Sequence, residues 1–421
     1  MRHLVIVGAG TAGTVMANRL ARALRGEIKA GRTLITVIDP SPVHLYQPGL
    51  LFIPFGTYTR QDLERSRAPT LSEDVHYFQG EIGSMDPTTD TIALSTGKIF
   101  SYDVCIIATG TQIAPEETEG MLGDGWRERV FDFYTLDGAL ALHEALERFD
   151  GGRLVVNVVE MPIKCPVAPL EFAFLADEYF TKRGIRDHVA ITYATPLDAA
   201  FTKPQSAKAL GHLLEEKRVH LETEFNCGRV DGAAGELVSW DERRIPFDLL
   251  VTVPVHKGAS FIGSVPGLGD AMNFVRTDPR TLQAELKANI FAIGDATNVP
   301  TSKAGSVAHF ESEVLAANVL HFLRGEPLEP LFDGHANCFI ETGYEKALLI
   351  DFNYDTEPLP GHFPFAWGPL PLLRESKLNH LGKLAFRHVY WNALLPGLDL
   401  PGIPIQMKRS GKEYPTEPVA L

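Results

Sequence analysis

The first forty residues place three glycines between a buried strand and a helix. Apolar residues 4–7 are typical of the strand, Gly8, Gly10 and Gly13 follow it, and the apolar periodicity of a helix comes next. Gly8 permits a tight turn, Gly10 lets the backbone approach a pyrophosphate, and Gly13 brings helix and strand together. The helix N-terminus offers free N–H groups to phosphates. The next strand, TLITVID at residues 33–39, ends on Asp39, which can accept hydrogen bonds from a ribose. The pattern predicts a dinucleotide-binding α/β domain.

Length and composition narrow the class of protein further. A chain of 421 residues is expected to form two or three domains. The net charge of −14 argues against nucleic acid as a partner. No apolar run approaches the roughly 20 residues that span a bilayer. The four cysteines are scattered and form no CxxC pair, so we expect neither a disulfide framework nor a metal site.

Two later segments carry further dinucleotide signatures. The run YDVCIIATGTQ is a buried strand that ends in Thr109-Gly110, and NIFAIGDATNVPTSKAGSVAHF is a strand followed by a long helix. These segments resemble the ATG and GD motifs of the pyridine nucleotide–disulfide oxidoreductase superfamily. The resemblance implies that FAD binds at a discontinuous domain, residues 1–113 and 285–335. The expected contacts in the later segments are Thr109, Gly110, Gly294, Asp295, Lys303 and Gly305.

A second Rossmann-like domain is predicted at residues 150–256. It opens with the strand RLVVNVVE and continues through HVAITYAT and DLLVTVPV. In NAD(P)H-dependent relatives the first strand leads into another glycine-rich turn. Here no glycine lies between Gly152 and Gly184, and MPIKCPVAPLEF occupies that place. A nicotinamide dinucleotide is therefore not expected to have its normal phosphate site.

The four cysteines divide into two groups. Cys105 lies mid-strand and Cys227 near a strand end, so both are expected to be buried structural residues. Cys165 follows Lys164 and stands before a helix, an environment that we expect to lower the pKa of its thiol. The local sequence around Cys338 leaves a structural and a reactive role equally open.

The motifs KCPVAPLE, NCF and YQPGLLFIPFG resemble the sulfide:quinone oxidoreductase family over nearly the whole chain. The resemblance implies that Cys165 and Cys338 are a redox pair beside the flavin and that Glu171 is an acid–base residue. It also implies that Lys383 and Phe386 contact a quinone. Relatives with covalent flavin have a third cysteine where residues 111–160 have none, so FAD is expected to bind non-covalently. The histidine-rich glycine segment of many relatives is also replaced here by PLDAAFTK.

The last region, residues 336–421, is expected to hold the late cysteine and a membrane-binding helix. Between residues 374 and 412 there are seven Lys or Arg and two acids, and LNHLGKLAFRHVYWNALL is amphipathic. This pattern favours a helix lying in a membrane interface. The alternative is a helix packed on its own domain or on a second copy of the chain.

The predicted activity is the oxidation of sulfide to sulfane sulfur, with electrons passed through FAD to a membrane quinone. Sulfide would attack a Cys165–Cys338 disulfide, which leaves one cysteine persulfidated and the other a thiolate. The expected location is peripheral, on the cytoplasmic face of a prokaryotic inner membrane, and a homo-oligomer is compatible with the sequence. The alternatives are a flavocytochrome c sulfide dehydrogenase subunit, a type II NADH:quinone dehydrogenase, and a flavin-bearing persulfide sensor with little turnover.

Overall fold

The computed structural model describes residues 1–400 and 402–414. Its first sheet is parallel, in the order β20-β9-β1-β2-β5. The central strands are buried on both faces, which is why their sequences are continuous apolar runs. Strand β20 joins the sheet from a segment far along the chain, beside β9. The bounds are β1 (Arg2–Val7), β2 (Thr33–Asp39), β5 (His76–Gln79), β9 (Val104–Ile107) and β20 (Ile290–Ala292).

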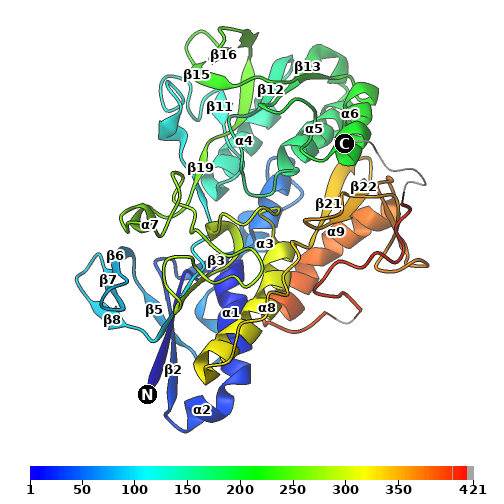
Figure 1. Ribbon diagram of the computed structural model, residues 1–421. Helices are drawn as coiled ribbons and strands as arrows, with labels where there is room; N and C mark the ends of the chain where they lie inside the picture. The colour runs from blue at the N-terminus through cyan, green and yellow to red at the C-terminus, as the bar shows by residue number, and fades with distance from the viewer. Residues whose placement is uncertain (401, 415–421) are drawn as a thin grey trace.

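Two helices, α1 (Thr11–Ala23) and α8 (Gly305–Arg324), pack side by side against this sheet (Figure 1). Each begins just after a strand of the sheet, so both N-termini lie at its carboxyl edge. That edge is where ligands bind in open α/β sheets.

The second sheet is also parallel, in the order β11-β18-β12-β13-β14. Its first strand in the chain, β11, precedes residue 150, so the sheet begins earlier than the predicted boundary. The strand has only two residues and no recognisable pattern, which is why the sequence did not reveal it. The bounds are β11 (Val130–Phe131), β12 (Gly152–Val158), β13 (Val189–Ala194), β14 (Val219–Glu222) and β18 (Leu249–Val253), with helices α4 (Leu136–Arg148), α5 (Ala168–Lys182) and α6 (Pro204–Glu216).

Small antiparallel sheets and short helices decorate the two parallel sheets. The strands are β3 (Val43–Leu45) with β4 (Glu64–Ser66); β6 (Ile82–Asp86), β7 (Thr91–Leu94) and β8 (Ile99–Ser101); β10 (Gln112–Ile113) with β19 (His256–Lys257); and β15 (Cys227–Asp231), β16 (Glu236–Ser239) and β17 (Arg244–Pro246). The short helices are α2 (Arg25–Lys29), α3 (Arg60–Leu63) and α7 (Ser260–Gly263), and the 3₁₀ turns span Gln47–Phe52, Ala68–Thr70, Pro115–Glu117, Arg186–His188 and Gly294–Ala296.

The C-terminal region covers parts of both α/β units (Figure 1). Its first strand, β21, packs on α5 of the second unit and on α8 of the first, and helix α9 packs on the β21–β22 hairpin. The bounds are β21 (Ala336–Gly343), β22 (Lys346–Phe352), β23 (Gly361–Phe363), β24 (Leu370–Leu372), α9 (Lys377–Val389) and a π-helical turn, Tyr390–Leu394. Residues 401 and 415–421 of the predicted region 336–421 lie outside the described residues.

The predicted α/β class with two Rossmann-like units is confirmed. In residues 1–400 and 402–414, no helix combines the length and apolarity needed to cross a membrane.

Candidate functional site

The three N-terminal glycines lie where β1 turns into α1. Gly8 has φ +94°, and a Cβ there would meet the Ala108 carbonyl oxygen at 2.5 Å. A Cβ on Gly13 would meet the Gly8 oxygen at 1.9 Å, whereas one on Gly10 would meet nothing within 4 Å. The first and third glycines therefore close the turn, and Gly10 leaves open space in front of the helix N-terminus, as a bound pyrophosphate requires.

A cavity opens at this edge of the first sheet and gathers most of the predicted site residues. It is bordered by both helix N-termini, by the segment before α5, and by residues of β21 and α9. Among its lining residues are Gly10, Thr109, Gly110, Cys165, Glu171, Gly294, Asp295, Lys303, Gly305, Cys338, Lys383 and Phe386. Gly8, Gly13 and Asp39 do not line it.

The Asp39 side chain stabilises the turn between β1 and α1. Its carboxylate accepts hydrogen bonds from the Ala9 amide (2.7 Å) and the Ser41 amide (2.9 Å) and lies 3.3 Å from the Arg67 guanidinium. Arg67 is buried and also donates to the Ala9 and Val43 carbonyls. The carboxylate thus holds the first turn in shape, and a contact with a ribose stays a prediction.

Lys303 points to the backbone of the GD segment. Its Nζ donates to the carbonyls of Asp295 (3.0 Å) and Thr297 (2.6 Å). On the opposite side, the Gly294 amide donates to the buried Glu311 carboxylate at 2.6 Å. Burial raises the pKa of Glu311 to about 8, although the Gly294 bond opposes the shift. The sequence did not single out Glu311. It stands among the residues of the buried face of α8, and no motif marks it.

The segment after β12, which stands in place of a second glycine-rich turn, docks onto the first unit. The Cys165 amide donates to the Lys303 carbonyl at 2.7 Å, and Cys165 has φ +47°, unusual for a residue with a side chain. The Lys164 ammonium donates to Gln47 (3.0 Å) and the Tyr134 carbonyl (3.3 Å). These bonds turn the segment into the cavity and present the Cys165 thiol there.

The predicted low pKa of the Cys165 thiol is wrong. Burial raises the pKa of Cys165 well above its ordinary value and that of Cys338 to about 12. The helix begins three residues after Cys165, and the Lys164 ammonium is engaged elsewhere. The cation that favours both thiolates is Lys383, and Glu171 opposes them.

Glu171 and Lys383 form a buried ion pair at the cavity. The Glu171 Oε1 atom accepts from Lys383 Nζ and from the Glu341 amide at 2.6 Å, and Lys383 also donates to the Phe339 carbonyl at 3.0 Å. Burial opposes the charge on Lys383, but Glu171, Cys165 and Glu341 raise its pKa above the ordinary value. Glu171, the predicted acid–base residue, and Lys383, a predicted quinone contact, are therefore bonded directly to each other.

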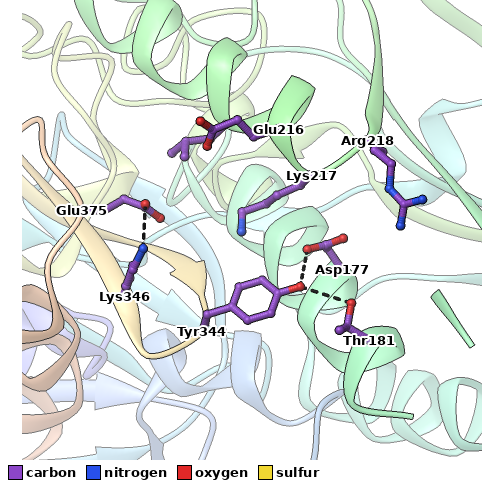
Figure 2. A pocket seen from close by; sticks show the side chains of 9 residues that line it. Asp177, Thr181, Glu216, Lys217, Arg218, Tyr344, Lys346 and Glu375 are labelled. Atoms are coloured by element: carbon purple, nitrogen blue, oxygen red, sulfur yellow. Dashed lines mark hydrogen bonds and ion pairs between the residues drawn. The ribbon is translucent and has the colours of Figure 1, made fainter. Parts of the chain in front are cut away.

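Both cysteines line the cavity because β21 runs alongside α5. The Glu341 amide bonds Glu171, and the Tyr344 hydroxyl donates to Asp177 at 2.8 Å (Figure 2). Between these two bonds the helix advances about 9 Å, and β21 ends in a bulge and a turn in which Gly343 and Tyr344 have positive φ. At the other end of β21, Cys338 and the segment before α5 both line the cavity.

The hydrogen bond between Tyr344 and Asp177 joins the ends of β21 and α5 that lie away from the cavity. It lies in a surface cleft (Figure 2). The Tyr344 hydroxyl is 3.2 Å from the Thr181 hydroxyl, and Asp177 also pairs with the buried Arg186 at 2.6 Å. The hairpin tip is therefore fixed to the second unit by two side chains of α5.

Tyr134 is a site residue that sequence reasoning missed. It is buried, lines the cavity, and donates from its hydroxyl to the Cys165 carbonyl at 3.2 Å. It follows the short strand β11, and no motif marks it. Gln47, which accepts from Lys164, lies in the motif YQPGLLFIPFG that carried the family resemblance.

Comparisons with known proteins agree with this architecture. Residues 2–310 match the family model described as pyridine nucleotide-disulphide oxidoreductase. Two similar relatives are named mitochondrial sulfide:quinone oxidoreductases. The one from Mus musculus is 27% identical and the one from Dictyostelium discoideum is 26% identical, each covering 94% of this chain and 86% of the relative.

Among solved structures, the sulfide:quinone oxidoreductase from Aquifex aeolicus superposes with a TM-score of 0.78 at 20% identity. The match covers 94% of this chain and 92% of that one. These relatives confirm the resemblance that the motifs indicated, and the family model spans well over half of the sequence. The chain belongs to the pyridine nucleotide-disulphide oxidoreductase family.

Proposed function

We propose that the protein is an FAD-dependent sulfide:quinone oxidoreductase that works through Cys165 and Cys338. The observation that carries the proposal is the cavity itself, where both cysteines and the Glu171–Lys383 pair meet at the edge that carries the glycine turns. The relatives with that printed name span nearly the whole chain, including the cysteine segments.

The residues present fit FAD. Gly10 and Gly305 stand at two helix N-termini, and a Cβ added to either would meet nothing within 4 Å, which leaves room for phosphates and for a ring system. The Thr109 hydroxyl is buried with no partner among the described residues and is available to a ligand. Bound FAD supplies a two-electron carrier between the sulfur chemistry and the quinone. No cysteine lies in residues 111–160, so the flavin is held without a covalent bond there.

The cysteines take up the sulfur. HS⁻ bonds to one sulfur of the oxidised pair, the S–S bond breaks, and the other cysteine leaves as a thiolate. Burial disfavours that thiolate, and the Lys383 ammonium offsets the cost. Glu171 lies beside the same ammonium and can hold the proton that the reaction moves.

A peripheral membrane location follows from the surface of the C-terminal region. Leu378 and Leu381 are 44% and 58% exposed on one side of α9, and Trp367 is 82% exposed beside Phe365. Aromatic and leucine side chains of this kind favour a membrane interface, where a quinone is dissolved. The relatives include mitochondrial proteins, so we retain the peripheral membrane part of the expected location and not the prokaryotic inner membrane.

Positive charge on this surface contributes less to membrane binding than the number of basic residues in the sequence indicated. Lys383, Arg387 and Lys412 pair with Glu171, Asp62 and Asp351, and Lys377 pairs with Glu345. Four of the seven basic residues are therefore engaged within the protein. Apolar contact, and not attraction to anionic lipid, is expected to dominate.

Anaerobic mixing of the flavin-loaded protein with sulfide tests the proposal. Sulfide should bleach the flavin absorbance rapidly, and a short-chain quinone should restore it. NADH should act far more slowly, because Cys165 and its neighbours occupy the place of the second phosphate turn. Rapid bleaching by NADH with no response to sulfide would instead identify a type II NADH dehydrogenase. Bleaching by sulfide with reoxidation only by a cytochrome would identify the flavocytochrome alternative.

A further inference from the structure

The cavity carboxylate has no direct access to solvent. Glu171 is 0% exposed, its Oε1 atom is bonded to Lys383 and to the Glu341 amide, and its Oε2 atom is buried with no partner among the described residues. A proton that Glu171 gives to a substrate must therefore be replaced through other side chains.

The proposed reaction needs such a replacement. Oxidation of sulfide and reduction of a quinone balance as HS⁻ + H⁺ + Q → S⁰ + QH₂. The two electrons come from sulfide, one proton of the quinol is the one that HS⁻ carried, and the other comes from solvent. Each turnover with HS⁻ thus takes up one proton, and a proton that replaces the one on Glu171 must reach a fully buried carboxylate.

A second buried carboxylate, Glu341, lies next to this site and leads outward. Its side chain is 1% exposed, and its two oxygens are 2.9 and 3.1 Å from Nδ1 of His380. The His380 side chain is 20% exposed. His380 and Lys383 are three residues apart on α9, so they share one face of the helix and point toward the same strand.

Lys383 is the cation that acts on both carboxylates. It donates to Glu171 and to the Phe339 carbonyl, two residues before Glu341 on β21, and it is a principal charge acting on Glu341. Its ammonium can give a proton to Glu171, and after rotation of the flexible stem the amine can take one from Glu341, which His380 then reprotonates. Burial raises the pKa of Glu341, against Lys383 and His380, so a protonated Glu341 is accessible.

We propose that His380 and Glu341 form the proton entry to the quinone site, passing a proton from solvent by way of Lys383 to Glu171. The inference rests on the proposed function. The charged groups around His380 are Glu341 and Glu345 of the hairpin and Lys377 and Lys383 of its own helix.

The test separates the two half-reactions in His380→Ala and Glu341→Gln. Flavin reduction by sulfide in the absence of quinone should keep its wild-type rate. Reoxidation of dithionite-reduced protein by a short-chain quinone should slow at least tenfold. Added imidazole should restore reoxidation in His380→Ala, because it can occupy the vacated position, and should not help Glu341→Gln.

His388→Ala is the matched control, since His388 lies on the exposed side of the same helix and does not contact Glu341. It should behave as wild type in both half-reactions. The relay is overturned if His380→Ala is reoxidised at the wild-type rate. It is also overturned if both half-reactions slow equally and imidazole does not rescue them. Either result would leave His380 and Glu341 as a structural ion pair. A wild-type protein that sulfide does not reduce contradicts the proposed function instead, so the two failures are distinguishable.

Discussion

At the scale of single residues, Cys165 and Cys338 are partly buried thiols that line one cavity and share one cation. Serine keeps the size of each side chain and cannot form a persulfide, so either single exchange should lower sulfide-driven turnover by at least about 100-fold. Because residues that act as a unit are not additive, the double Cys165→Ser/Cys338→Ser protein should be hardly worse than either single. Steady-state assays with measured FAD content check both statements.

Cys105 and Cys227 provide the controls for this prediction. Both are buried in strands away from the cavity, 0% and 5% exposed. Their exchange for serine should cost stability and leave turnover per bound flavin unchanged. A Cys338→Ser protein with wild-type turnover would contradict the assigned pair.

Glu311 gives a prediction on the pH dependence of stability. Its pKa is about 8 in the folded protein against 4.5 for a free side chain. Between these values the unfolded carboxyl is ionised while the folded one stays protonated, so this residue's contribution to stability is full below pH 4.5 and is lost as pH rises through 8. Glu311→Gln should therefore raise the melting temperature by a few degrees at pH 8 and hardly at all at pH 5. An equal shift at both pH values would contradict a buried neutral carboxyl.

At the scale of elements, α9 directs one side inward and the other outward. Lys383 and Phe386 line the cavity, whereas Leu378 and Leu381 face out. Each leucine that enters a membrane interface contributes on the order of 1–2 kcal/mol, so Leu378→Ser/Leu381→Ser should weaken liposome binding by roughly 30- to 1,000-fold. Sulfide should still reduce the flavin. Flotation with neutral and anionic vesicles at two salt concentrations measures the effect.

Trp240→Ser is the control for this double exchange. Trp240 is 77% exposed, after β16 of the second unit, and its removal should leave liposome binding unchanged. Unaltered flotation of the double leucine variant would favour a helix that packs on another copy of the chain.

The elements that sequence reasoning predicted best are those with strong local patterns. Residues 33–39 form β2 as predicted, because a strand buried on both faces is a continuous apolar run. The glycine turns were equally visible. The pairing of Glu171 with Lys383 was not, since it depends on how α9 and α5 both pack on β21. The thiol pKa was wrong for a related reason: the sequence shows neighbouring charges, but only the fold shows burial.

At the scale of the whole molecule, the hairpin tip sets the position of Cys338 through its bond to the second unit. Tyr344→Phe removes the hydroxyl that donates to Asp177, a bond to a charged group worth about 1.5–3 kcal/mol. If part of that energy holds the register of β21 against α5, the midpoint potential of the cysteine pair should shift by on the order of 10–30 mV. Thiol trapping in redox buffers measures it.

Tyr77→Phe is the matched control, because it removes a comparable hydroxyl that donates to Ser41 at 2.8 Å in the first unit. It should leave the potential of the cysteine pair in place. Identical potentials in wild type and Tyr344→Phe would show that β21 keeps its register without the bond to Asp177.

The packing of β21 on α5 also determines which segments can be exchanged between relatives in a chimeric protein. In the chain β21 comes after the first unit is complete, yet its side chains cover a helix of the second. A fragment cut at residues 150 and 256 would leave that face of α5 bare, with Glu171 separated from Lys383 and the Glu341 amide, and Asp177 separated from the Tyr344 hydroxyl. Chimeras between relatives should therefore fold and react only when the second unit and the β21–β22 hairpin come from the same parent. These two segments are separate in the sequence but must be exchanged together.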